Sequence, residues 1–119
     1  MIDGSVFQLK RQPLNCSQHE GAHCVTAVWD VQSALPYFDG HFPGNPVLPG
    51  VAMIDAILEA IGGKLTALKS AKFMRPIYPG MMVDIRAHQV SPGDWTVELI
   101  EPGQEPSVRV LASFSMTAA

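Results

Sequence analysis

Seven prolines and glycines fall within residues 36–50, and this segment constrains the fold more than any other part of the chain. They are Pro36, Gly40, Pro43, Gly44, Pro46, Pro49 and Gly50. Proline fixes φ and has no N–H to donate, so this density excludes a helix or a central strand. We therefore expect residues 32–50 to form a long loop. A loop of that length in a small domain usually carries function or acts as a lid.

A helix is expected directly after this loop, over residues 51–61 (VAMIDAILEAI). Its residues tolerate helix well, and Gly62-Gly63 predicts a left-handed cap at its end. The segment is apolar on nearly every side, which predicts a buried helix rather than an amphipathic surface one. Its two polar side chains, Asp55 and Glu59, are four residues apart and share a face.

The remaining segments alternate apolar and polar residues, the period of a β-strand. We expect strands over residues 22–31, 65–75, 81–90, 95–100 and 107–116, the last four as a meander, and one short strand within residues 1–19. Hydrophobic residues make up 47% and charged residues 16% of the chain, which excludes a disordered protein. The layout predicts one α+β domain over residues 1–119, a helix wrapped by an antiparallel sheet.

Charge and cysteine content narrow the partners and the location. The formal net charge is -3, which argues against nucleic acid or an anionic membrane as the main partner. Cys16 and Cys24 form neither a metal-type pair nor a disulfide framework, so we expect free thiols and no metal. The N-terminus lacks the basic start and apolar run of a secretory signal, and the apolar helix is broken by acids, so we expect a cytoplasmic protein.

The candidate chemistry lies where the loop meets the helix. A carboxylate in an apolar helix needs a partner or a raised pKa, so Asp55 is either catalytic or, with Glu59, a polar seam facing water or a dimer mate. His41 is either a surface residue or a base held by the proline-rich loop. The free amides at the helix start can bind an oxyanion. A base, an acid and an oxyanion site together can remove a proton beside a thioester carbonyl and expel a β-hydroxyl.

The loop and helix carry a recognisable pattern. Residues 41–55 (HFPGNPVLPGVAMID) resemble the HFPGxPxxPGxxxxE/D motif of the (3R)-3-hydroxyacyl-[acyl-carrier-protein] dehydratases. Residues 72–80 (KFMRPIYPG) resemble their RFxRPVxPGD segment, with Met81 in place of the final acid. The short chain is also similar to the small dehydratases of aryl-polyene and related polyketide-like gene clusters.

This resemblance implies a hotdog fold, a long central helix wrapped by a curved antiparallel sheet, and a dimer whose sheets join edge to edge. It also implies residue roles. His41 would take the α-proton, aimed by the backbone carbonyl of Val47. Asp55, contributed by the other protomer, would protonate the leaving hydroxyl. The Gly50 N–H would bind the thioester oxygen. The implied product is a trans-2-enoyl thioester, made in fatty-acid or polyene-type biosynthesis without a metal or diffusible cofactor, because the phosphopantetheine arm belongs to the carrier.

Two residues depart from the pattern. Asp55 stands where dehydratase-only relatives carry Glu, and matches the acid of the dehydratase/isomerase branch. Glu59 stands where both branches usually carry Gln. It would either raise the pKa of Asp55 by like-charge repulsion or serve as a structural residue at the mouth of the substrate tunnel.

Further candidates bind the acyl chain or the carrier. Tyr37 and Phe38, with Met53, Ile54 and Phe73, would line an acyl tunnel or belong to the core. Lys72 and Arg75 would either dock an acidic acyl carrier protein or form an ordinary solvated face. The alternatives to a homodimeric dehydratase are a hotdog thioesterase and a non-catalytic subunit of a heterodimer or higher assembly.

Overall fold

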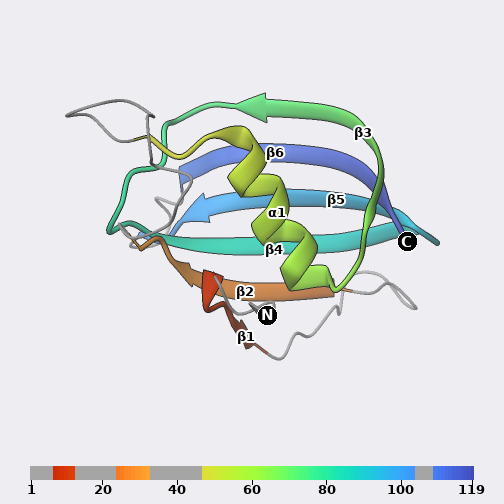
Figure 1. Cartoon of the computed structure of the whole chain (residues 1–119), viewed down its shortest axis with the longest axis horizontal. Helices are drawn as coiled ribbons and strands as arrows, with labels where there is room; N and C mark the ends of the chain where they lie inside the picture. Colours follow the sequence, from red (N-terminus) through yellow and green to blue (C-terminus); the bar gives the residue numbers. More distant parts are fainter. Residues whose placement is uncertain (1–6, 13–23, 33–46, 104–108) are drawn as a thin grey trace, which may run out of the picture.

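The computed structural model describes residues 7–12, 24–32, 47–103 and 109–119. In this part of the chain six strands form one antiparallel sheet with one helix against it (Figure 1). The strands are β1 (Lys10–Gln12), β2 (Cys24–Asp30), β3 (Leu65–Phe73), β4 (Met82–Ser91), β5 (Asp94–Glu101) and β6 (Arg109–Ala118). The helix is α1 (Gly50–Ile61). The α+β expectation is confirmed, and each strand lies within two residues of its expected bounds.

The strand order is β1-β2-β4-β5-β6-β3, which differs from the expected meander of the last four strands. β4, β5 and β6 do form a meander, but β3 crosses over and pairs with β6 at the far edge. The alternation within each strand was visible in the sequence. The partner of β3 was not, because pairing depends on contacts distant along the chain.

The core lies between α1 and the face of the sheet that α1 covers. Trp29 on β2, Ile85 on β4, Leu99 on β5 and Phe114 on β6 are all buried on that face. Alternate residues such as Arg86 and Glu98 point to the opposite face and are exposed. The alternation of apolar and polar residues therefore separates a packed inner face from a polar outer face.

Helix α1 buries only one of its sides in the single chain. Its buried residues are Ala52, Met53, Ala56, Ile57 and Ala60. Val51 is 59% exposed, and Ile54, Asp55, Leu58 and Glu59 are half-buried. The expectation of a buried helix therefore holds in one chain only for the side that faces the sheet. The expected cap is confirmed: Gly62 has φ 75°, and its N–H donates to the carbonyl of Leu58.

Candidate functional site

At the start of α1, the N–H groups of Gly50 and Val51 have no hydrogen-bond partner among the described residues. Pro49 is the N-cap, in an extended conformation, and no side chain caps the helix within the described residues. The first amides seen in backbone bonds are those of Ala52 and Met53, both of which donate to the Pro49 carbonyl. The N–H groups at the beginning of a helix have no partner inside it and carry partial positive charge. Gly50, the first helical residue, therefore begins a site suited to an anionic oxygen.

The two sequence motifs meet next to this helix start. The Leu48 N–H donates to the Ile77 carbonyl at 2.8 Å, and both side chains are buried. The segment that follows β3 is also tied to the sheet, because the N–H groups of Met74 and Arg75 donate to the Leu111 carbonyl. These bonds hold the end of β3 beside the N-terminus of α1.

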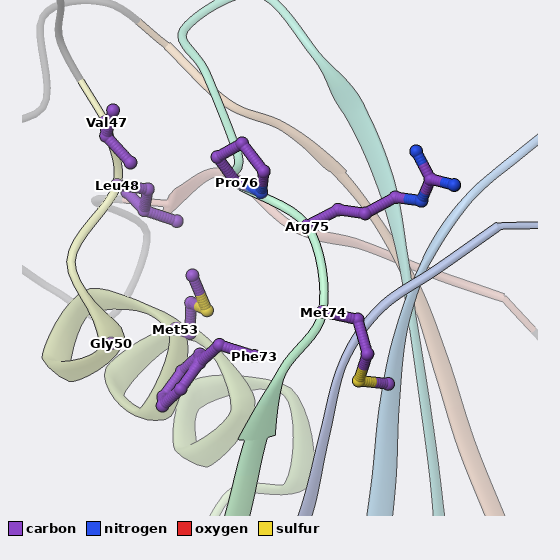
Figure 2. A pocket seen from close by; sticks show the side chains of 8 residues that line it. All are labelled: Val47, Leu48, Gly50, Met53, Phe73, Met74, Arg75 and Pro76. Atoms are coloured by element: carbon purple, nitrogen blue, oxygen red, sulfur yellow. The ribbon is translucent and has the colours of Figure 1, made fainter.

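A hollow of about 280 Å³ lies between these two segments (Figure 2). Its lining comprises Val47, Leu48, Gly50, Met53, Phe73, Met74, Arg75 and Pro76. The structure thus brings together Val47, Gly50 and Arg75, three of the predicted site residues. The sequence interpretation missed Leu48, Met74 and Pro76, although all three belong to the two motif segments. Of the tunnel candidates it offered, Met53 and Phe73 line the hollow, whereas Ile54 does not.

Phe73 forms one wall of the hollow and lies against the helix start. A Cβ built on Gly50 would lie 2.8 Å from Phe73 Cζ and 3.2 Å from Cε1, so the ring contacts the backbone of Gly50 directly. Figure 2 shows the ring directed over the first turn of α1. Among the described residues, the ring also packs edge-to-face on Phe114, with the ring centroids 5.7 Å apart. Phe73 is nevertheless 56% exposed.

Asp55 and Glu59 lie elsewhere on α1. Neither lines the hollow, and both belong to the half-buried side of the helix that faces away from the sheet. Asp55 follows Gly50 by five residues, which places it about 7.5 Å further along the helix axis and about 140° around it. Within one chain, the predicted acid and the predicted oxyanion site therefore do not face the same space.

Lys72 and Arg75 lie in different environments. Lys72 pairs with Ser113, and Ser113 with Glu98, so Lys72 belongs to the outer face of the sheet. Arg75 follows the end of β3 and lines the hollow. In Figure 2 its side chain extends away from α1.

The remaining predicted residues include several that the structure does not describe. His41, Tyr37, Phe38 and Cys16 lie outside the described residues. Cys24, the first residue of β2, is disulfide-bonded, so the prediction of a free thiol is wrong for this residue. Spacing alone could not reveal the bond, because disulfide formation depends on the separation of the two cysteines in space.

Neither a metal site nor a membrane span is found in the described part of the chain. Its His, Cys, Asp and Glu residues form no group of three or more that could hold a metal ion. The helix is shorter than a membrane crossing requires.

Solved structures with the same architecture cover nearly the whole chain. An uncharacterized protein from Erwinia carotovora has a TM-score of 0.74 at 22% identity, over 93% of this chain and 95% of that one. The dehydratase heterocomplex ApeI:P from Xenorhabdus doucetiae contains a chain with a TM-score of 0.67 at 21% identity, over 91% of this chain and 98% of that one. The PaaI protein from Escherichia coli has a TM-score of 0.69 at 13% identity, over 97% of this chain and 85% of that one. These identities support the fold alone.

Curated relatives match in sequence over part of their length. The 3-hydroxyacyl-[acyl-carrier-protein] dehydratase FabZ from Oleidesulfovibrio alaskensis is 36% identical over 52% of this chain and 50% of its own length. The FabZ protein from Verminephrobacter eiseniae is 35% identical over 60% of this chain and 59% of its own. The chain thus spans between half and three-fifths of the length of these two relatives.

The fold and the hollow at the helix start define a hotdog-fold protein, as the motif resemblance implied. The model of the ApeI-like family, described as ApeI dehydratase, matches residues 17–110. The chain therefore belongs to the ApeI-like dehydratase family.

Proposed function

We propose that this protein dehydrates (3R)-3-hydroxyacyl thioesters, carried on an acyl carrier protein, to trans-2-enoyl thioesters. The observation that carries the proposal is the uncapped start of α1 at Gly50, which opens onto an apolar hollow built from both dehydratase motifs. A thioester oxygen at the Gly50 N–H would have its developing negative charge stabilised by that amide and by the helix dipole. Membership of the ApeI-like family supports the same chemistry.

The proposed step uses two side chains. His41 removes a proton from the α-carbon, and the electron pair left behind forms the double bond as the β-carbon–oxygen bond breaks. Asp55 donates a proton to the departing hydroxyl, so that water leaves. Each positioned acid or base contributes roughly 10²–10⁴-fold to the rate. We propose that the Val47 carbonyl is the acceptor that would fix the tautomer of His41.

Two copies are needed for this arrangement. Asp55 lies on the side of α1 that the sheet does not cover, away from the hollow of its own chain. Strand β3 is an edge strand, and its side chains are exposed except for the half-buried Ala71. We propose that β3 of one copy pairs with β3 of another, so that Asp55 of each copy serves the hollow of its partner. Glu59, one turn further along, would lie near the mouth of that shared site.

The assembly is tested by sedimentation velocity. The wild type is expected to sediment as a dimer or a multiple of one, and Leu68→Asp on β3 to dissociate it. Asp84→Asn on the outer face is the matched control and should leave the assembly intact. A wild-type monomer would contradict the homodimer. If that monomer becomes active with a second hotdog chain, the alternative of a heterodimer is favoured.

Activity is tested on a short 3-hydroxyacyl-carrier/enoyl-carrier pair by mass spectrometry. We expect interconversion by loss or gain of one water, reduced at least 100-fold in Asp55→Asn and in His41→Ala and retained in Asp84→Asn. Release of free acid would contradict the dehydratase and indicate a thioesterase. No conversion by a folded, assembled protein, with any chain length tried, would indicate a non-catalytic subunit.

The carrier protein is proposed to dock beside the hollow through Arg75, with Lys72 as a weaker contributor on the outer face. Neither residue takes part in the ion pairs found among the described residues, which join Lys69 to Asp94 and Arg86 to Asp84. Acyl carrier proteins are acidic, so these free cations provide charge complementarity, and such docking weakens with salt.

We propose that the protein acts in the cytoplasm, where carrier-bound acyl chains are made. The disulfide at Cys24 is unusual for that compartment. Rapid alkylation of intact cells tests the proposal: a reduced, alkylated Cys24 is expected, and a protected Cys24 would point to an oxidising compartment.

A further inference from the structure

We propose that Phe73 determines which acyl chains this site accepts, by restricting it to short ones. This inference rests on the proposed function, since it concerns the same hollow. It is carried by the contact between the Phe73 ring and the backbone of Gly50.

The ring occupies the space directly above the proposed oxyanion site. Because a Cβ on residue 50 would lie 2.8 Å from Cζ, only glycine at this position lets the ring approach so closely. An acyl group whose carbonyl reaches the Gly50 N–H must therefore pass the edge of the Phe73 ring. Among the described residues, no other aromatic side chain lines the hollow.

The hollow is small in the single chain. With the ring in place it measures about 280 Å³, just below the range of about 300–1,000 Å³ typical of small-molecule sites. Leu48 and Met53 close its inner side and are buried, so they cannot move without disturbing the core. Phe73 is the wall residue whose removal would enlarge the hollow at the least structural cost.

The ring can be replaced without loss of the fold. In the single chain the ring is more than half exposed, and it belongs to the last residue of β3 rather than to the middle of the strand. Phe114, the aromatic side chain that the ring contacts in the described part of the chain, remains packed in the core without it. Substitution should therefore change selectivity rather than folding.

The test compares the wild type with Phe73→Ala and Phe73→Leu on four-, eight- and twelve-carbon enoyl thioesters. We expect the ratio of kcat/KM for eight carbons over four carbons to rise about tenfold in Phe73→Ala, with an intermediate rise in Phe73→Leu. Val90→Ala is the matched control, because Val90 is an exposed apolar residue of β4, away from the proposed β3 pairing, and does not line the hollow. An unchanged ratio in a folded Phe73→Ala protein would overturn the inference.

A binding measurement separates this inference from the proposed function. Unreactive alkyl thioethers of pantetheine, with four or eight carbons, are titrated calorimetrically into each variant. Suppose that the wild type converts no thioester but binds the four-carbon probe more tightly, and that Phe73→Ala loses this preference. The proposed dehydratase activity would then be contradicted, whereas the role of Phe73 would be supported. If the wild type and Phe73→Ala show the same ratio of the two affinities, the role of Phe73 is contradicted even if turnover is found.

Discussion

The ring of Phe73 lies against the backbone of Gly50, so the last residue of an edge strand touches the first residue of the helix. Gly50 belongs to the first motif, residues 41–55, and Phe73 to the second, residues 72–80, so the two residues are distant along the chain. Their contact depends on the crossover that sends β3 to the edge of the sheet beside β6. The site therefore depends on the strand order as much as on the motif residues themselves.

Gly50→Ala should reduce activity much more than stability. The added methyl group meets the far end of a flexible ring, which can turn aside, and alanine favours the helix by up to about 1 kcal/mol over glycine. We expect a free energy of unfolding within about 1 kcal/mol of wild type and a loss of kcat/KM of at least about tenfold, because the methyl group and the displaced ring crowd the oxyanion site.

Denaturant unfolding measures the free energy of unfolding of Gly50→Ala, and a turnover assay on the same preparation measures its kcat/KM. A Gly50→Ala protein as active as wild type would show that the start of the helix does not hold the reacting oxygen. Gly63→Ala is a poor control, because a Cβ there would approach the backbone carbonyl of Ala119 at 3.1 Å.

Ile57→Ala should destabilise the fold. The side chain is fully buried between α1 and the sheet, and removing a large apolar side chain from such a position costs about 2–5 kcal/mol. Val51→Ala, on the exposed side of the same helix, should change the free energy of unfolding by less than about 0.5 kcal/mol. Urea unfolding of both variants measures the difference. Similar values would mean that the helix packs through another side.

The pKa of Asp94 should lie below its ordinary value of 3.8. Ser91 Oγ donates to one carboxylate oxygen at 2.6 Å, and the Lys69 ammonium contacts the other at 2.9 Å, and both lower the pKa. Because the folded pKa is the lower one, the ionised group adds stability above pH 3.8. That contribution is lost as the pH falls through the folded value.

A carboxyl-carbon NMR titration tests both causes. Ser91→Ala and Lys69→Met should each raise the pKa of Asp94, since each removes a hydrogen bond that lowers it. Added salt should weaken the effect of Lys69 and leave that of Ser91 nearly unchanged. A pKa of Asp94 that neither substitution raises would contradict the geometry at this turn.

Arg75→Ala should weaken use of a carrier-bound substrate more than Lys72→Ala does. Arg75 lines the hollow, whereas Lys72 lies on the outer face of the sheet. We expect KM for the carrier-bound thioester to rise about three- to tenfold in Arg75→Ala and less than threefold in Lys72→Ala, with kcat nearly unchanged. A pantetheine thioester without the carrier is the control substrate, and an equal rise in KM on it would argue against docking.

The elements that local pattern controls could be predicted from the sequence. The helix over residues 51–61, its glycine cap and the alternation within each strand depend on neighbours close along the chain, and all three are confirmed. The place of β3 could not be predicted. Its alternation allows pairing with any strand, and the choice depends on a crossover that brings residues 65–73 beside residues 112–118.

The sequence motifs were enough to predict which residues lie at the hollow, but not how side chains from different elements are oriented around it. Val47, Gly50 and Arg75 meet at the hollow because both motif segments meet there. The separation of Lys72 from Arg75 was missed, because it depends on β3 ending at Phe73 and on the side chain of Lys72 facing the outer side of the sheet. The half-exposed side of α1 was also missed. Its apolar residues indicate burial, but not whether the covering surface belongs to the same chain.

The bond from the Leu48 N–H to the Ile77 carbonyl has a consequence for engineering. Since both partners are main-chain atoms, no single side-chain replacement can delete it, but a change of backbone path in either segment can. A chimera that takes the first motif from a longer relative but keeps the native residues 72–80 combines two backbone paths that need not place these two atoms within hydrogen-bond distance. Both segments should therefore be exchanged together.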